Sequence, residues 1–159
     1  MTSQYFTYEK AKVIQALRYH FITRKEIKVF MVVVNIFALV SAGLFYYKKI
    51  SPFAFLLSSV LWLVMMLIFW IILPFSVYKK TKTFRDTFRI NLNENDFTLQ
   101  NERGSRTWQW VELSAWLESP HFYHLYFNSR SFLIIPKAAF QGQDVNEVRR
   151  LLRRNIKTG

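Results

Sequence analysis

The distribution of apolar residues divides the chain into three parts. Two long apolar runs occupy residues 29–47 and 53–78, and neither contains Asp, Glu, Lys, Arg or His. The hydrocarbon core of a bilayer is about 30 Å thick, so a helix needs about 20 residues to cross it. A small soluble domain has too little protein to bury two helices that are apolar on all sides. The pattern therefore predicts a transmembrane hairpin of two helices, and its length and position argue against a cleaved signal peptide.

The residues before the first run predict a short strand followed by a helix. Gln4–Thr7 has the aromatic and β-branched composition of a strand, and Thr7 is placed to cap a helix over residues 8–21. Apolar side chains share one face of this helix, whereas its Lys and Arg residues lie elsewhere. Such a helix can lie in the membrane interface or pack as core on a soluble domain. The pattern leaves both alternatives open, and also whether Gln4–Thr7 joins a sheet.

After residue 79 the apolar period changes from helical to alternating. Short strands are predicted over residues 88–92, 97–99, 106–110, 114–118, 122–127 and 131–135. A closing helix follows, in which Asp144 and Glu147 have the spacing of a capping box. The predicted fold is a transmembrane α-helical hairpin plus a small α+β domain, an antiparallel sheet or barrel capped by a C-terminal helix. The predicted boundaries are 1–28, 29–78 and 79–159.

Positive charge concentrates beside the two apolar runs. The chain carries a net charge of +12, and eleven Lys or Arg residues flank the runs while two, Lys48 and Lys49, lie in the connecting loop. The positive-inside rule therefore predicts a multi-pass protein with both termini in the cytoplasm. Nucleic-acid binding is not indicated, because no groove-reading or base-stacking motif accompanies the charge. Anionic lipid headgroups are the expected contact for Lys25, Lys28, Lys79, Lys80, Lys82 and Arg85.

No pattern typical of catalysis, of a cofactor or of a metal site is found. The chain has no cysteine, and its four glycines are isolated, so no phosphate-binding loop is formed. The three histidines, His20, His121 and His124, lack the spacing of metal ligands. We expect a protein that is not an enzyme and that holds neither a metal nor a cofactor.

Polar and aromatic residues inside the runs are candidates for helix packing. An amide in hydrocarbon needs a partner, so Asn35 is expected at a helix–helix contact. Small residues at 41–43 and 58–59 favour close packing of the hairpin or of a partner subunit. Trp62 and Trp70, eight residues apart, are candidates for packing against a partner helix.

Three stretches of the C-terminal part carry a family resemblance. Residues 110–113 (WVEL), 122–127 (FYHLYF) and 134–140 (IIPKAAF), together with the order of strand, helix, two spans and β-domain, resemble the YcxB-like family of bacterial membrane proteins. The resemblance implies a bacterial inner-membrane protein with a pleckstrin-homology-like C-terminal domain, and it implies no catalytic residues.

Four residues of these stretches are expected to be structural. Trp110 is predicted to share a strand face with Trp108, and this pair is expected to belong to the core or, alternatively, to form an exposed protein-binding patch. Pro136 ends the last strand because it cannot donate to a sheet. Lys137 is predicted to be exposed beyond it, and Phe140 to fold back onto the core.

Three functions remain compatible with the sequence. The first is a non-enzymatic, membrane-anchored interaction module, an accessory or scaffold subunit with a protein partner or a second copy of itself. The second is a module that binds or senses anionic lipid. The third is a component of a transporter or a membrane enzyme. We expect the first.

Overall fold

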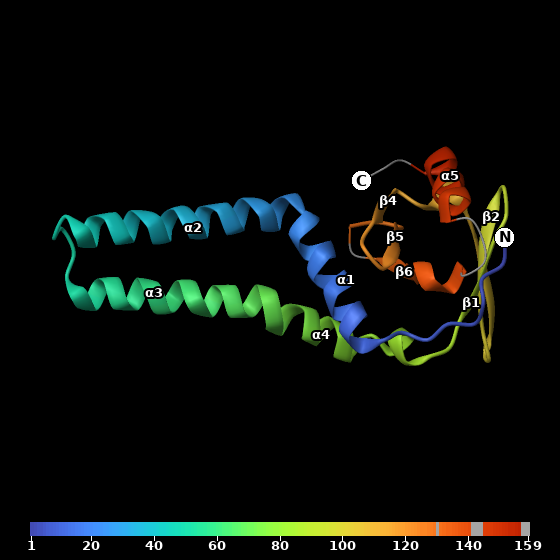
Figure 1. The fold of residues 1–159 in the computed structure, drawn as a ribbon, viewed down its shortest axis with the longest axis horizontal. Coiled ribbons are helices and arrows are strands. Elements are labelled where there is room, and N and C mark those ends of the chain that lie inside the picture. The colour runs from blue at the N-terminus through green and yellow to red at the C-terminus, as the bar shows by residue number, and fades with distance from the viewer. Residues whose placement is uncertain (130, 141–144, 157–159) are drawn as a thin grey trace. The chain divides into compact units, whose positions relative to one another are not determined.

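The computed structural model describes residues 1–129, 131–140 and 145–156, and the chain divides into two compact units (Figure 1). One unit consists of residues 1–16 and 82–159, and the other of residues 17–81. The first helix, α1 (Lys10–Thr23), contributes residues to both units.

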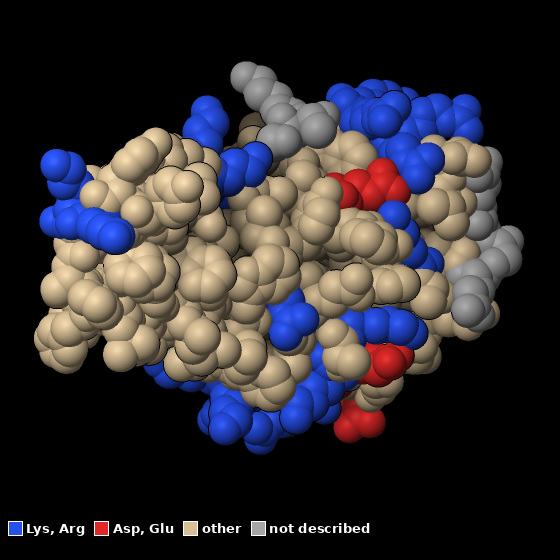
Figure 2. Space-filling model, turned by 60° about the vertical axis from the view of Figure 1, so that its left-hand side comes forward, with Lys and Arg blue, Asp and Glu red and all other residues tan. Residues whose placement is uncertain are grey.

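The unit formed by residues 17–81 contains the two predicted apolar helices. They are α2 (Lys25–Tyr46) and a second helix made of α3 (Pro52–Leu67), the π-helical turn η1 (Ile68–Ile72) and α4 (Leu73–Lys80). Both are long and apolar enough to cross a membrane, and none of the most apolar stretch of the second is buried within the chain. Figure 2 shows a wide surface that carries no Lys, Arg, Asp or Glu.

A tight turn joins these two helices. Lys48 adopts a left-handed conformation, with a φ of 56°. Ser51 then caps α3, because its Oγ accepts a hydrogen bond from the Ala54 amide at 3.2 Å. Pro52 occupies the first turn of α3, where its missing N–H is not needed.

The other unit contains two three-stranded antiparallel sheets and a closing helix. The first sheet has the order β1-β2-β3 and the second the order β4-β5-β6. The strands are β1 (Arg89–Leu92), β2 (Asp96–Asn101), β3 (Gly104–Gln109), β4 (Ala115–Glu118), β5 (Phe122–Tyr126) and β6 (Phe132–Pro136). Short 3₁₀ turns follow β3 and β6, η3 (Trp110–Glu112) and η4 (Lys137–Phe140), and the helix is α5 (Val145–Asn155).

The alternating pattern of the sequence corresponds to the buried face of each sheet. Ile90 and Leu92 of β1 are opposite Leu99 and Phe97 of β2, and all four are buried. Val148 and Leu152 of α5 are also buried, as the apolar stripe of that helix predicts. The predicted small α+β domain with a closing helix is confirmed at this level, and the strands form two sheets. The predicted cap at Asp144 lies outside the described residues.

The N-terminal segment pairs with the edge of the first sheet. Ser3 and Phe6 donate their amides to the carbonyls of Ile90 and Phe88, each at 2.8 Å. Antiparallel bridges join Thr2 to Asn91 and Phe6 to Phe88. The segment therefore extends the sheet along β1, which the sequence had left open, although it forms isolated bridges and not a strand over residues 4–7. The predicted cap at Thr7 is wrong, because α1 begins at Lys10.

Two further predictions about the β-domain are corrected. Trp110 is buried as predicted, but it lies in the 3₁₀ turn η3 and does not share a strand with the half-buried Trp108. Its indole N–H donates to the Asn93 carbonyl at 3.1 Å. Lys137 is not exposed, since its side chain keeps only 21% of its accessible surface in an ion pair with Glu118.

Candidate functional site

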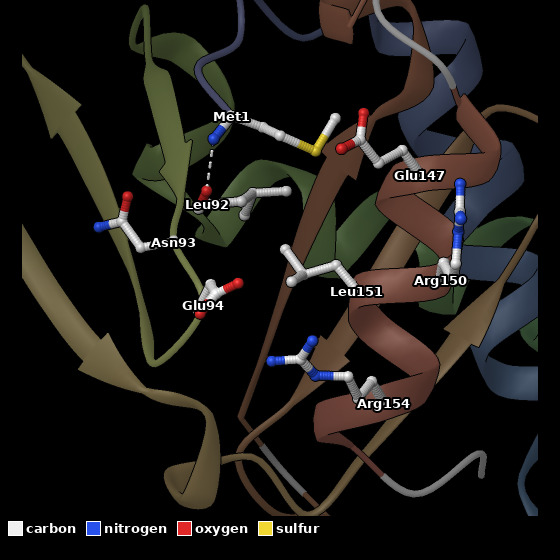
Figure 3. Close-up of a pocket in the computed structure, with 8 residues that line it drawn as sticks. All are labelled: Met1, Leu92, Asn93, Glu94, Glu147, Arg150, Leu151 and Arg154. Carbon is white, nitrogen blue, oxygen red and sulfur yellow. Dashed lines mark hydrogen bonds between the residues drawn. The ribbon is translucent and has the colours of Figure 1, made fainter.

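A groove beside α5 is the candidate binding surface of the β-domain. Its volume is about 580 Å³, and it separates α5 from the turn between β1 and β2 (Figure 3). It is lined by Met1, Leu92, Asn93 and Glu94 on one side and by Glu147, Arg150, Leu151 and Arg154 of α5 on the other.

The α5 wall of this groove follows from helical spacing. Glu147, Arg150, Leu151 and Arg154 recur at intervals of three and four residues, so they share one face of the helix. Across the groove, the amino group of Met1 donates to the Leu92 carbonyl at 2.6 Å. The spacing along α5 was visible in the sequence, but the opposite wall depends on the pairing of the N-terminal segment with β1.

The lining of this groove combines charged side chains of both signs with two leucines. Arg150 and Arg154 are opposed by Glu94 and Glu147, and the apolar lining comes from Leu92 and Leu151. Polar groups around an apolar surface are typical of a recognition site. None of the lining side chains is a hydroxyl or imidazole that could act as a nucleophile with its base.

A second cluster links β4, η4 and α5. Glu118 accepts hydrogen bonds from Lys137 Nζ at 2.7 Å and from Arg149 Nε and Nη2, both at 2.8 Å. The pKa of Glu118 is lowered to about 2, chiefly by the hydrogen bond from Arg149 and further by Lys137. Burial acts in the opposite direction. The ammonium of Lys137 also lies 5.4 Å from the centre of the Tyr123 ring.

This ion-pair cluster has a structural explanation. A bidentate Arg–carboxylate pair is strong and fixes geometry, so Glu118 holds α5 against the end of β4. Tyr123 adds a hydrogen bond from its hydroxyl to the Val145 carbonyl at 3.3 Å. Burial is the main cause that raises the pKa of Tyr123. Lys137 is thus held in an ion pair with Glu118, where the sequence had predicted an exposed side chain.

The remaining motif residues also lie at structural positions. Pro136 ends β6 opposite Phe122, and Phe140 is buried with 1% exposure. Of the histidines, His124 is buried, with Nε2 3.0 Å from Ser119 Oγ. Within residues 1–129, 131–140 and 145–156, no three His, Asp or Glu side chains gather as metal ligands do.

Two pairs of side chains form hydrogen bonds between α2 and α3. The Trp62 indole Nε1 donates to Asn35 Oδ1 at 3.4 Å, and Asn35 Nδ2 donates to the Met31 carbonyl at 2.8 Å. Ser41 and Ser58 share a hydrogen bond at 2.6 Å between their Oγ atoms. Two of the three candidate packing residues thus lie in the same contact between α2 and α3. Trp70, by contrast, contacts Arg18 of α1.

The predicted lipid-facing residues lie at the ends of the apolar helices or in the short turn after them. Lys25 and Lys28 are in the first turns of α2, and Lys79 and Lys80 end α4. Lys82 and Arg85 belong to a 3₁₀ turn, η2 (Lys82–Arg85). All six are exposed.

Comparison with known proteins gives a match for part of the chain. Residues 92–152 match the family model described as YcxB-like protein. This range contains the motif residues Trp110, Pro136, Lys137 and Phe140 and runs from the end of β1 into α5. Neither the curated proteins nor the solved structures give a significant match to the chain. The predicted resemblance to the YcxB-like family is therefore confirmed over residues 92–152.

Proposed function

We propose that the protein is a non-enzymatic, membrane-anchored interaction module, an accessory or scaffold subunit of a larger bacterial inner-membrane assembly. In this proposal α2 and the helix from Pro52 to Lys80 cross the membrane, and both termini are cytoplasmic. The two sheets and α5 form a pleckstrin-homology-like domain on the cytoplasmic side, which presents the groove beside α5 to a protein partner.

One observation carries this proposal. No residue of the most apolar stretch of the second helix is buried by the chain, although one side of this helix contacts α2; in water such an exposed apolar surface would be covered by association. Lipid or a partner helix must therefore cover it. The same chain also folds a compact domain whose groove combines Arg150 and Arg154 with Glu94, Glu147 and an apolar floor. We therefore infer that the apolar helices anchor a domain whose groove contacts a protein partner.

The decisive experiment is the composition of the particle in native membranes. We expect other chains to co-purify with the full protein at fixed stoichiometry after extraction in mild detergent. The double variant Arg150→Glu/Arg154→Glu should lose them, because it reverses the positive charge of the groove. The control is Arg153→Glu, since Arg153 is exposed on the same helix and does not line the groove. It is compared with Arg150→Glu alone as well, so that the net charge changes by the same amount in both.

Two results would contradict the proposal. A chain that purifies alone, or only with copies of itself, would exclude an accessory subunit. Equal loss of partners in the Arg153 control and in the double variant would assign the effect to net charge and not to the groove.

The alternative function is binding of anionic lipid by the basic residues next to the apolar helices. It is favoured by the exposure of the six Lys and Arg residues that flank these helices. Each such residue near a membrane surface contributes about 1 kcal/mol of attraction to anionic lipid. It becomes the leading function if the protein purifies alone with bound anionic lipid.

A further inference from the structure

Arg18 of α1 contacts the second apolar helix at an irregular point. Its Nε donates a hydrogen bond to the Trp70 carbonyl at 2.9 Å, and its guanidinium carbon lies 5.9 Å from the centre of the Trp70 indole. Trp70 belongs to η1, within the apolar run that contains no charged residue of its own. The fold therefore brings a cation against an apolar helix at a place that the sequence alone did not indicate.

Pro74 removes the α-helical donor to the Trp70 carbonyl. Proline has no N–H, so Pro74 cannot donate to the carbonyl four residues before it, which is that of Trp70. The helix changes to a π-helical turn just before Pro74, over Ile68–Ile72. Arg18 supplies a hydrogen bond to the carbonyl that Pro74 leaves open, and this bond fixes the orientation of the guanidinium.

The other donors of Arg18 remain available. A guanidinium has five N–H donors in a planar fork, and the bond to Trp70 uses the one on Nε. No described residue accepts a hydrogen bond from Nη1 or Nη2 of Arg18. A fixed guanidinium with free terminal donors matches the geometry of a phosphate group.

The surroundings of Arg18 are apolar, and the nearby sequence is basic. Arg18 borders a small hollow of about 20 Å³, which is lined by Phe21, Ile22, Ile27, Met31, Phe69 and Trp70. The hollow has room for little more than one methyl-sized group, and exposed apolar side chains of α2 continue beyond it. Arg24, Lys25 and Lys28 follow within the next ten residues, against the single acidic Glu26. A basic surface next to an apolar surface complements an anionic phospholipid, in which a negative headgroup is joined to apolar chains.

We propose that Arg18 is the phosphate-binding residue of a site for one anionic phospholipid of the cytoplasmic leaflet, oriented by the Trp70 carbonyl that Pro74 leaves open. The acyl chain lies along the hollow between α1 and the two apolar helices. This site differs from the exposed basic residues at the helix ends, which attract anionic lipid without a fixed geometry. It rests on the membrane anchoring in the proposed function, but not on a partner protein.

The test measures which lipid the full-length protein retains. The protein in detergent is given equal amounts of phosphatidylglycerol and phosphatidylcholine, and native mass spectrometry counts the lipids bound to it. We expect one phosphatidylglycerol to be preferred, and Arg18→Gln to lower that preference about tenfold, as loss of about 1.4 kcal/mol gives. Arg18→Lys keeps the charge without the planar fork, so it should lose part of the preference. Lys79→Gln, which removes one exposed charge, should keep it.

Pro74→Ala provides a second variant that leaves Arg18 in place. An alanine N–H can bond to the Trp70 carbonyl, so Arg18 loses its anchor while the net charge is unchanged. We expect a lower preference for phosphatidylglycerol in this variant too, and the result does not depend on whether Arg18→Gln folds. If Arg18→Gln and Lys79→Gln lower the preference equally, or Pro74→Ala and Arg18→Lys leave it unchanged, the site is excluded.

Two further arms separate the possible failures. Inorganic phosphate that competes as well as the lipid at equal concentration would assign Arg18 to a free anion and overturn the lipid site. A protein that alkaline carbonate releases from membranes would contradict the anchor itself, and with it the proposed function. A protein that stays in the membrane without lipid preference contradicts only the site at Arg18.

Discussion

At the scale of single residues, Glu118 makes the contact whose loss is easiest to measure. Replacing it by Gln leaves Lys137 and Arg149, both largely covered, without their carboxylate. We expect Glu118→Gln to lower the free energy of unfolding by about 1–2 kcal/mol at neutral pH, between the values for surface ion pairs and for charged hydrogen bonds. Thermal unfolding of the full chain in detergent, followed by tryptophan fluorescence, measures this change. Glu102→Gln, in an exposed turn, is the control and should be neutral.

The same residue predicts the direction of the pH dependence. The pKa of Glu118 is about 2 in the folded chain, against an ordinary value of 4.5. A carboxyl group with a lowered pKa stabilises the fold fully above its unfolded pKa, and this contribution is lost as the pH falls from about 4.5 towards 2. The difference in stability between the wild type and Glu118→Gln should therefore shrink in this range. A difference that stays constant down to pH 2 would contradict the assignment.

Residue types at motif positions were predictable, but their partners were not. The sequence predicts that Pro136 ends a strand, because a missing N–H is a local property. It could not predict that Lys137 is covered, because Glu118 and Arg149 lie 19 and 12 residues away along the chain and meet only through the fold. Arg18 was missed for the same reason, since its acceptor is a backbone carbonyl 52 residues further on.

At the scale of elements, the pairing of α2 with α3 is directly testable, because the chain contains no cysteine. The Oγ atoms of Ser41 and Ser58 are 2.6 Å apart, so Ser41→Cys/Ser58→Cys should form a disulfide under mild oxidation. Trypsin cleaves after Lys48 and Lys49, and mass spectrometry should then find the two helix peptides linked. Ser41→Cys/Ser59→Cys is the control, since Ser59 bonds to its own helix at the Phe55 carbonyl. Equal linkage in both pairs would show that the observed packing of the hairpin is wrong.

Elements with a strong period were predicted well, and those with mixed signals were not. The alternation at Ile90 and Leu92 gives β1, and the apolar runs give helices that extend a few residues into their charged flanks. Gln4–Thr7 looked like a strand but forms only bridges at Thr2 and Phe6. Gly43 was grouped with Ser41 as a close-packing residue, yet a Cβ atom there would meet nothing within 4 Å. Small size permits close packing, but it does not show which residues face the partner helix.

At the scale of the whole molecule, the N-terminal segment belongs with residues far along the chain. Residues 1–16 form one unit with residues 82–159, although the two apolar helices separate them in sequence. Tyr8 is part of this link, because its buried hydroxyl donates to the Ile134 carbonyl at 2.8 Å. Burial raises the pKa of this hydroxyl. The sequence was divided at the apolar runs, which placed residues 1–28 and 79–159 in different parts. The tertiary contacts show that residues 1–16 and 82–159 belong to one unit.

The membrane orientation is the remaining prediction for the whole molecule. Residues 1–16 and 82–159 form one unit, so both must lie on the same side of a membrane. A hairpin of two crossings satisfies this condition, because it returns the chain to the side from which it started. The flanking Lys and Arg residues outnumber those of the loop by eleven to two, so the positive-inside rule predicts that this side is the cytoplasm. Single cysteines report it without background: Lys49→Cys in the loop should react with a membrane-impermeant maleimide on intact spheroplasts, and Glu102→Cys in the β-domain only after lysis. The reverse pattern of labelling would show the opposite orientation. Labelling of both cysteines before lysis would contradict the hairpin, because a hairpin that crosses the bilayer places its loop and the β-domain on opposite sides.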